Sequence, residues 1–179
     1  NPQIIQNSQN ELSRFNKGGY YIINEERSKT FIRCGAYTDR PAQADNLHLD
    51  LWVDGINYLW DCGSYKYNTE EHYIKHFTGT AGHNTVTVDG QDQMLKGGRF
   101  IWFYWIKKAK AKLIKNDNFE FTGSIDAYRH LGGITHHRDV VKEKSILKWQ
   151  VTDHLNNNSG LELKQHWHIN PKVLDKVVI

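Results

Sequence analysis

The sequence predicts an all-β fold, an antiparallel β-sandwich of about ten or more strands in two stacked sheets. Aromatic residues are dense, with nine Tyr, seven Phe and six Trp among 179 residues. Aromatic side chains fit the half-buried surface of a sheet well. Short segments of alternating apolar and polar residues recur along the chain, and turn residues separate them. Because no long amphipathic helix accompanies these segments, a sandwich or barrel is expected.

Turn signals separate the expected strands. The clearest strand is 47–53, where every second residue is apolar and His48 points to the opposite face. In 83–88 we expect Val86 and Val88 to point inward and Thr87 outward. In chain order the expected strands are 20–23 after a Gly-Gly pair, 30–34 ended by a glycine, 47–53 with its hairpin partner 58–60 across Asp54-Gly55, the alternating 83–88 before Asp89-Gly90, the aromatic-rich 100–106, the Lys-alternating 108–113, and then 119–123, 138–141, 147–153 and 161–169.

The chain is long enough for one domain with a core of its own. Residues 1–17 are polar, lack clear alternation and are interpreted as a linker or a remnant of a preceding domain, so the domain covers 18–179. The net charge of +3 gives no global field that indicates nucleic acid. No apolar run has membrane-spanning length, so neither nucleic acid nor membrane is expected as a partner. Cys34 and Cys62 form a disulfide or, by the favoured interpretation, remain two thiols.

Three segments concentrate residues able to carry chemistry: 40–50, 61–68 and 82–93. Each has a structural explanation that spacing alone favours. His48 would be an exposed strand residue, Asp61 part of a turn, and His83 a residue that caps a strand. Scattered Asp and His residues are weak indications of a metal site.

Taken together, the motifs resemble the heparinase II/III-like polysaccharide lyase family. The likeness runs in order from about residue 18 to 168, and the His-Asn-Thr-Val segment is quite specific. The motifs are Gln43-Ala-Asp-x-Leu-His-x-Asp-Leu-Trp52, Asp61-x-Gly-x-Tyr-x-Tyr-Asn68, His83-Asn-Thr-Val-x-Val-Asp-Gly-Gln-Asp-Gln93, Gly97-Gly-Arg-Phe100, Asp126-Ala-Tyr-Arg129 and His137-Arg138.

The resemblance implies that a helical toroid precedes a C-terminal β-sandwich and that the active site lies between them. It implies acidic, uronate-containing polysaccharides such as glycosaminoglycans or alginate as substrates, cleaved by β-elimination without an organic cofactor. That reaction requires a group that neutralises the uronate carboxylate, a base and an acid. Family members take the neutralising residue and a tyrosine from the toroid. The chain alone is therefore expected to be catalytically incomplete, and its parent to be periplasmic or extracellular.

The resemblance also implies a divalent metal, zinc rather than calcium, on the sandwich side. Asp61 and His83 match two of its ligands, whereas the third ligand, a histidine in the family, falls at Gln43. An amide oxygen is a poor zinc ligand compared with imidazole. Asp45 is a further candidate for the metal shell. The alternative is a hydrogen-bonded Asp–His pair that anchors the loop 65–82.

The catalytic histidine of the family falls at Pro41, and His48 is the best replacement for its imidazole. Tyr73 is a candidate catalytic residue, and Tyr65 and Tyr67 are candidates for stacking on sugars, although core packing is the commoner role of a tyrosine. Arg99 follows two glycines and is a candidate for pairing with a carboxylate or sulfate. The alternative for Arg99 is an ordinary surface position.

Two other functions remain open. A non-catalytic carbohydrate-binding sandwich would use its aromatic residues to stack on sugars. A structural partner domain would use them to hold the helical domain in place. The substitutions at Pro41 and Gln43 keep both alternatives in play.

Overall fold

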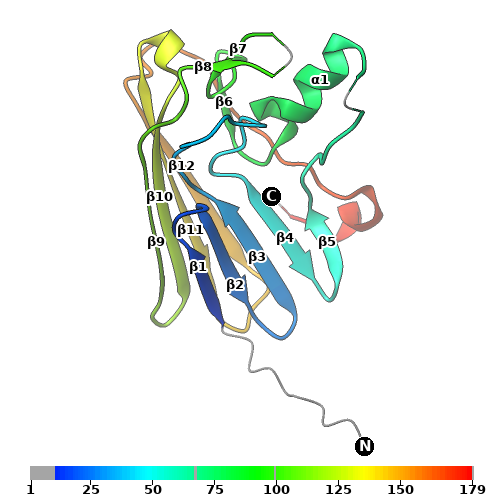
Figure 1. Cartoon of the computed structure of the whole chain (residues 1–179). Coiled ribbons are helices and arrows are strands. Elements are labelled where there is room, and N and C mark those ends of the chain that lie inside the picture. The colour runs from blue at the N-terminus through cyan, green and yellow to red at the C-terminus, as the bar shows by residue number, and fades with distance from the viewer. Residues whose placement is uncertain (1–10, 67, 99, 179) are drawn as a thin grey trace, which may run out of the picture.

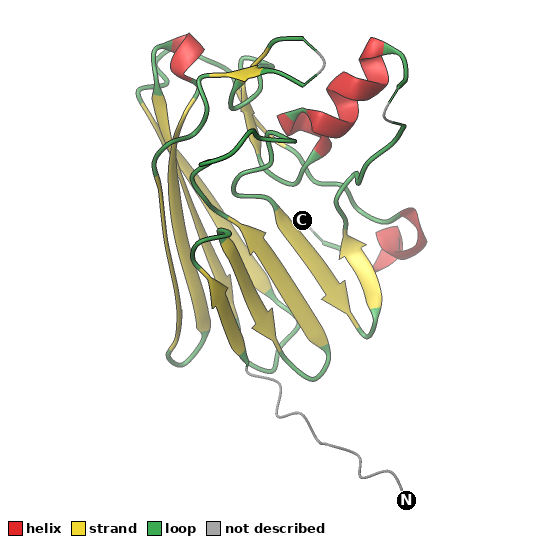
Figure 2. Ribbon diagram, in the orientation of Figure 1, coloured by secondary structure: helices red, strands yellow, loops and turns green. Residues whose placement is uncertain are grey.

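The computed structural model describes residues 11–66, 68–98 and 100–178, and in it two antiparallel sheets face each other (Figure 1; Figure 2). The predicted all-β sandwich is confirmed. One sheet has five strands in chain order, β1 (Leu12–Phe15), β2 (Tyr20–Asn24), β3 (Ser28–Arg33), β4 (Leu49–Val53) and β5 (Ile56–Leu59). The other has four in the order β12 (Trp149–Asn156), β11 (Ile134–Lys142), β10 (Phe119–Ala127) and β9 (Ala109–Lys115).

Two small sheets and one helix complete the described chain at one end of the sandwich, the top of Figure 1. β6 (Val86–Val88) pairs with β13 (Leu163–Gln165), and β7 (Leu95–Lys96) pairs with β8 (Trp102–Phe103). Helix α1 spans Glu71–Thr78, and short 3-10 turns cover Thr80–Gly82, Arg129–Leu131 and Pro171–Lys176. Within the described residues, no helix has the length and apolar character needed to cross a membrane.

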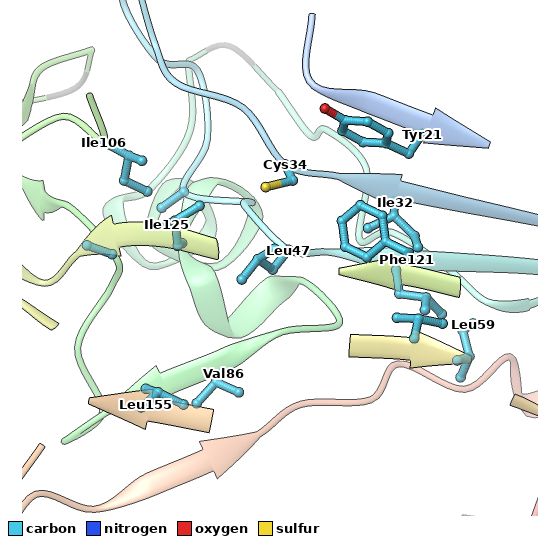
Figure 3. Close-up of a cluster of buried hydrophobic side chains, with 14 of the residues drawn as sticks. Tyr21, Ile32, Cys34, Leu47, Leu59, Val86, Ile106, Phe121, Ile125 and Leu155 are labelled. Carbon is cyan, nitrogen blue, oxygen red and sulfur yellow. The ribbon is translucent and has the colours of Figure 1, made fainter. Parts of the chain in front are cut away.

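The core lies between the two large sheets (Figure 3). On β4, Leu49, Leu51 and Val53 are buried, as the period-two pattern predicts. Tyr21 and Phe121 come from opposite sheets, and their ring centroids lie 5.4 Å apart. Burying this apolar surface, at about 25 cal/mol per Å², is the main stabilising contribution to the fold.

Both cysteines are free thiols, so the favoured interpretation without a disulfide holds. Cys34 lies in the core, where burial raises the pKa of its thiol to about 11. Burial and the neighbouring charge of Asp61 raise the pKa of Cys62 to about 12. Both thiols are therefore protonated and unreactive near neutral pH.

Several sequence predictions need correction. β1 lies within 1–17, the range interpreted as a linker, and pairs with β2. Helix α1 lies within the stretch expected to be a loop. Its half-buried residues Ile74, Phe77 and Thr78 share one face, but eight residues are too few to give a clear helical periodicity. The aromatic run 100–106 contributes only β8. The expected outward face of 83–88 is wrong, since Thr87 is as buried as its valine neighbours.

Candidate functional site

A pocket of about 400 Å³ opens between residues 40–43 and helix α1, and we name it the aromatic pocket. The loop after β5 and the segment between β7 and β8 complete its wall. Pro41 and Gln43, the two positions where the sequence departs from the family pattern, lie on its rim. Its other lining side chains include Arg40, Tyr65, Lys66, Tyr73, Phe77 and Phe100.

Three aromatic rings form the floor of this pocket. The ring of Tyr65 stacks on that of Phe77 at a centroid distance of 5.5 Å and an interplanar angle of 17°. The ring of Tyr73, on α1, lies 5.0 Å from that of Tyr65. Tyr65 is 49% exposed and Tyr73 39%, so part of each side chain faces solvent. A rigid, half-exposed aromatic surface with polar hydroxyls suits the apolar face of a sugar ring.

The structure therefore brings together two of the residues predicted to contact substrate, Tyr65 and Tyr73. Tyr67 and Arg99, the other two, lie outside the described residues. Gln43, predicted as a metal ligand, uses its amide nitrogen to donate to Phe77 O at 2.9 Å and to Gly63 O at 3.2 Å. It thereby ties the end of α1 to the loop after β5.

Next to this pocket, His48, Asp61 and His83 form a second group, the His–Asp cluster. Their ligand atoms lie within 4.8 Å of one another. His83 Nδ1 is 2.8 Å from Asp61 Oδ2, and His48 Nε2 is 3.7 Å from the same oxygen. Burial by itself raises the pKa of Asp61, but the hydrogen bond and charge of His83 hold it below its ordinary value. Asp61 is therefore an ionised carboxylate beside two rings.

His48 is locked in one protonation state. Its Nδ1 accepts a hydrogen bond of 2.9 Å from the backbone N–H of Asn84. Burial lowers its pKa to about 3, so the ring is neutral near pH 7. A neutral imidazole whose Nδ1 accepts carries its proton on Nε2. That nitrogen is buried without a hydrogen-bond partner among the described residues.

The protonation state of His48 determines whether the cluster can bind zinc through three ligands. Ligands of a tetrahedral zinc lie about 3.3 Å apart, and the two N–O distances are on either side of that value. Zinc coordinates an imidazole nitrogen that carries no proton, however, and His48 Nε2 carries one while Asn84 donates to Nδ1. Gln43 offers only an amide oxygen. The residues present therefore supply two strong ligands, His83 and Asp61, and do not make a three-ligand zinc site.

His48 does not line the aromatic pocket, and its side chain is 4% exposed. The structure thus places this predicted proton-transfer residue beneath the surface. Its ordered contact is with the backbone that carries His83 and Asn84. We assign it a positioning role. The placement also rejects the simpler interpretation of His48 as an exposed strand residue.

A buried ionic network that sequence reasoning did not predict lies behind the cluster. Arg138 on β11 donates from Nη1 to Leu47 O and Asn84 O, each at 2.6 Å. Its Nε and Nη2 both donate to Asp153 at 2.7 Å, and His136 Nε2 contacts the same carboxylate at 2.7 Å. Despite burial, these partners hold the pKa of Asp153 far below its ordinary value. Arg138 belongs to a sequence motif together with His137. Nothing in the sequence around it, however, indicates that it pairs with Asp153 on the neighbouring strand β12.

A larger groove of about 640 Å³ lies between β4, β5 and β12. Its wall is mostly apolar, with Leu49, Leu51 and Trp167 among its residues. The aromatic pocket, by contrast, is lined by Gln43 and Tyr65, which belong to the motifs that carry the family resemblance, and by the candidate Tyr73. The smaller pocket is therefore the better candidate for a functional site.

Comparisons with known proteins bear on the fold and the family of the chain. The heparan sulfate lyase HepC from Pedobacter heparinus, in a mutant crystal structure, superposes with a TM-score of 0.71 at 22% identity, over 90% of this chain and 24% of that one. A heparinase III superposes with a TM-score of 0.65 at 20% identity, over 83% of this chain and 22% of that one. The chain thus spans about a quarter of the length of these structures, and at such identity the likeness shows the fold. A search of curated proteins gives no significant match.

The family profile described as "Heparinase II/III-like, C-terminal" matches residues 7–178, which is nearly the whole chain. The sequence motifs, the sandwich and the solved structures all agree with that match. The chain belongs to the heparinase II/III-like family, as its C-terminal domain.

Proposed function

We propose that this chain is the sandwich part of a polysaccharide lyase that cleaves uronate-containing polysaccharide by β-elimination. Its family supports the lyase assignment, and the aromatic pocket is the observation that supports a saccharide site on this chain. The solved relative named a heparan sulfate lyase makes a glycosaminoglycan a reasonable substrate class. The parent protein would be exported to the periplasm or the cell surface, where such polymers occur.

In the proposed reaction a base removes the proton at C5 of a uronate. The electron pair forms the C4–C5 double bond as the C4–O bond breaks, and the departing oxygen takes up a proton. Tyr65, supported by the ring of Phe77, would hold a sugar ring by stacking, and the hydroxyl of the half-exposed Tyr73 would transfer a proton. The group that neutralises the uronate carboxylate would come from a helical domain of the parent. The isolated chain would bind saccharide without turning it over.

The number of metal ions bound per chain is a measurable part of this proposal. Zinc would be preferred over calcium, because the cluster offers imidazole nitrogen. The protonated Nε2 of His48 leads us to expect far less than one metal ion per chain. Elemental analysis of protein purified without a chelator, beside His83→Ala, measures it directly. Stoichiometric zinc that disappears in His83→Ala would show that His48 or Gln43 does complete the site.

A non-catalytic carbohydrate-binding role is the second candidate. It is favoured by proline and glutamine at positions 41 and 43, where the family resemblance expects histidines. The burial of His48 adds to this, since the sandwich then presents no imidazole to the aromatic pocket among the described residues. Binding would survive in that case, and elimination would be absent from the parent as well.

The test is the formation of unsaturated uronate, followed by its ultraviolet absorbance. Heparan sulfate and a polyuronate would be incubated with this chain and with the longest natural polypeptide that contains it. We expect product only from the longer polypeptide, and loss of product with Tyr73→Phe, which removes the hydroxyl and keeps the ring. Tyr20→Phe, at an exposed tyrosine on β2, is the matched control. Binding without product in the longer polypeptide would establish the non-catalytic alternative.

A further inference from the structure

The charge of the aromatic pocket points to the part of the saccharide it recognises. Two cationic side chains, Arg40 and Lys66, line it, and no carboxylate does so among the described residues. We propose that Arg40 and Lys66 form an anion-recognition pair for a carboxylate or sulfate on the sugar ring held by Tyr65. This inference rests on the proposed saccharide site and names the residues that would give it specificity for acidic sugars.

Arg40 lies against an aromatic ring, and its positive charge is not neutralised by an acidic side chain among the described residues. Its guanidinium carbon lies 5.5 Å from the ring centroid of Phe100, which is a cation–π distance. The side chain is exposed, and within the described residues it has no ion pair or hydrogen bond to protein. Its planar fork of N–H donors therefore remains available. Such a fork binds a carboxylate or sulfate through two parallel hydrogen bonds.

Lys66 is placed by the same ring that would hold the sugar. Its Nζ lies 5.7 Å from the ring centroid of Tyr65. A pyranose that contacts Tyr65 would therefore have a flexible cation within reach of its carboxylate or sulfate. Lys66, like Arg40, has no carboxylate partner within the described residues. The pair gives the pocket a local positive charge that the small overall charge of the chain does not reveal.

Elsewhere several surface cations are already matched by acids. The ion pairs are Arg27–Asp54, Lys108–Asp126, Lys115–Glu11 and Lys148–Glu143. A second basic pocket, of about 480 Å³, includes Lys107, Lys108 and Arg129, but Asp126 lies in its wall 3.7 Å from Lys108. Lys29 on β3, by contrast, borders none of these pockets. Unneutralised charge and stacked aromatic rings coincide at the aromatic pocket.

The experiment measures the affinity of the whole chain for three oligosaccharide probes by isothermal titration calorimetry. One probe is a polyuronate tetrasaccharide, which carries carboxylates only. The second is sulfated cellotetraose, which carries sulfates only, and the third is neutral cellotetraose. The variants are Arg40→Gln, Lys66→Gln and the double variant. Lys29→Gln combined with Lys172→Gln is the charge-matched control, since both lysines are exposed and remote in the fold.

We expect at least one anionic probe to bind more tightly than neutral cellotetraose. The double variant should bind that probe about tenfold more weakly, and the control within about twofold of the wild type. Which anionic probe binds identifies carboxylate or sulfate as the recognised group. All variants should keep the wild-type urea unfolding midpoint, because both cations are exposed.

Three results would contradict the proposal that Arg40 and Lys66 form an anion-recognition pair. The first is unchanged affinity in the double variant, the second is an equal loss in the control, and the third is equal binding of the neutral probe. Each would leave the saccharide site itself standing. Absence of binding by all three probes would overturn both this inference and the proposed function. The two failures are thereby distinguishable.

Discussion

The aromatic pocket and the His–Asp cluster are neighbours that use opposite physical principles. Gly63 joins them, since its carbonyl accepts from Gln43 at the pocket and its N–H donates to Asp61 in the cluster. In the cluster, buried side chains are fixed by backbone hydrogen bonds. In the pocket, exposed rings and cations have few polar partners within the protein. Exposure, rather than residue type, thus distinguishes the proposed binding surface from the buried cluster beside it.

The largest effect is expected at the network that supports the cluster. Arg138→Met should reduce the free energy of unfolding by about 3–5 kcal/mol, because Asp153 would remain buried without its cation. Urea unfolding measures this. Arg27→Met, at an exposed ion pair, is the control and should cost less than about 1 kcal/mol. Equal, small losses in both variants would show that the network does not support the fold.

His48→Ala should come next, at about 2–4 kcal/mol. It leaves the buried N–H of Asn84 without an acceptor and opens a cavity. Saccharide affinity should stay near the wild-type value, since His48 does not line the aromatic pocket. His154→Ala, at an exposed histidine of β12, should change neither quantity. If His48→Ala kept full stability and lost saccharide binding, the cluster would be the binding site and the comparison between cluster and pocket would be wrong.

Acid should destabilise the protein through the same residue. The pKa of His48 is about 3 in the fold, against about 6.5 for an unfolded histidine. Its contribution is therefore complete above pH 6.5 and is lost as pH falls toward 3, by about 2 kcal/mol at pH 5. Burial also lowers the pKa of His136, which adds in the same direction. Unfolding at pH 7 and pH 5 should show a smaller difference in His48→Gln than in the wild type or His154→Gln.

In the pocket, by contrast, a substitution should affect saccharide binding more than stability. Tyr65→Ala should change the free energy of unfolding by less than about 0.5 kcal/mol, because the ring is half exposed. It should weaken binding of an acidic oligosaccharide by about 1 kcal/mol, through loss of the stacking surface. Phe15→Ala, at an exposed ring on β1, should leave binding intact. A stability loss without a binding loss would make Tyr65 a packing residue.

The sequence predicted the sandwich well, because period-two strands such as β4 report burial directly. Residues of the motifs also come together in the structure, since Tyr65 lines the aromatic pocket and Asp61 and His83 belong to the His–Asp cluster. Burial of His48, which lies just before β4, was harder to foresee, because the segment that contacts it, at Asn84, is distant in sequence. Helix α1 was missed because its amphipathic pattern covers only eight residues, too few to distinguish a helix from a loop.

The central claim is that saccharide binds at the aromatic pocket rather than at the His–Asp cluster. Amide chemical-shift mapping by NMR, with the ¹⁵N-labelled chain and a polyuronate tetrasaccharide, tests it most directly. We predict saturable shifts concentrated at the amides of residues 40–43, Tyr65 and Tyr73–Phe77, with small changes at His48 and His83. Shifts centred on His48 and His83 or on β9, or no saturable shift at all, would contradict the claim.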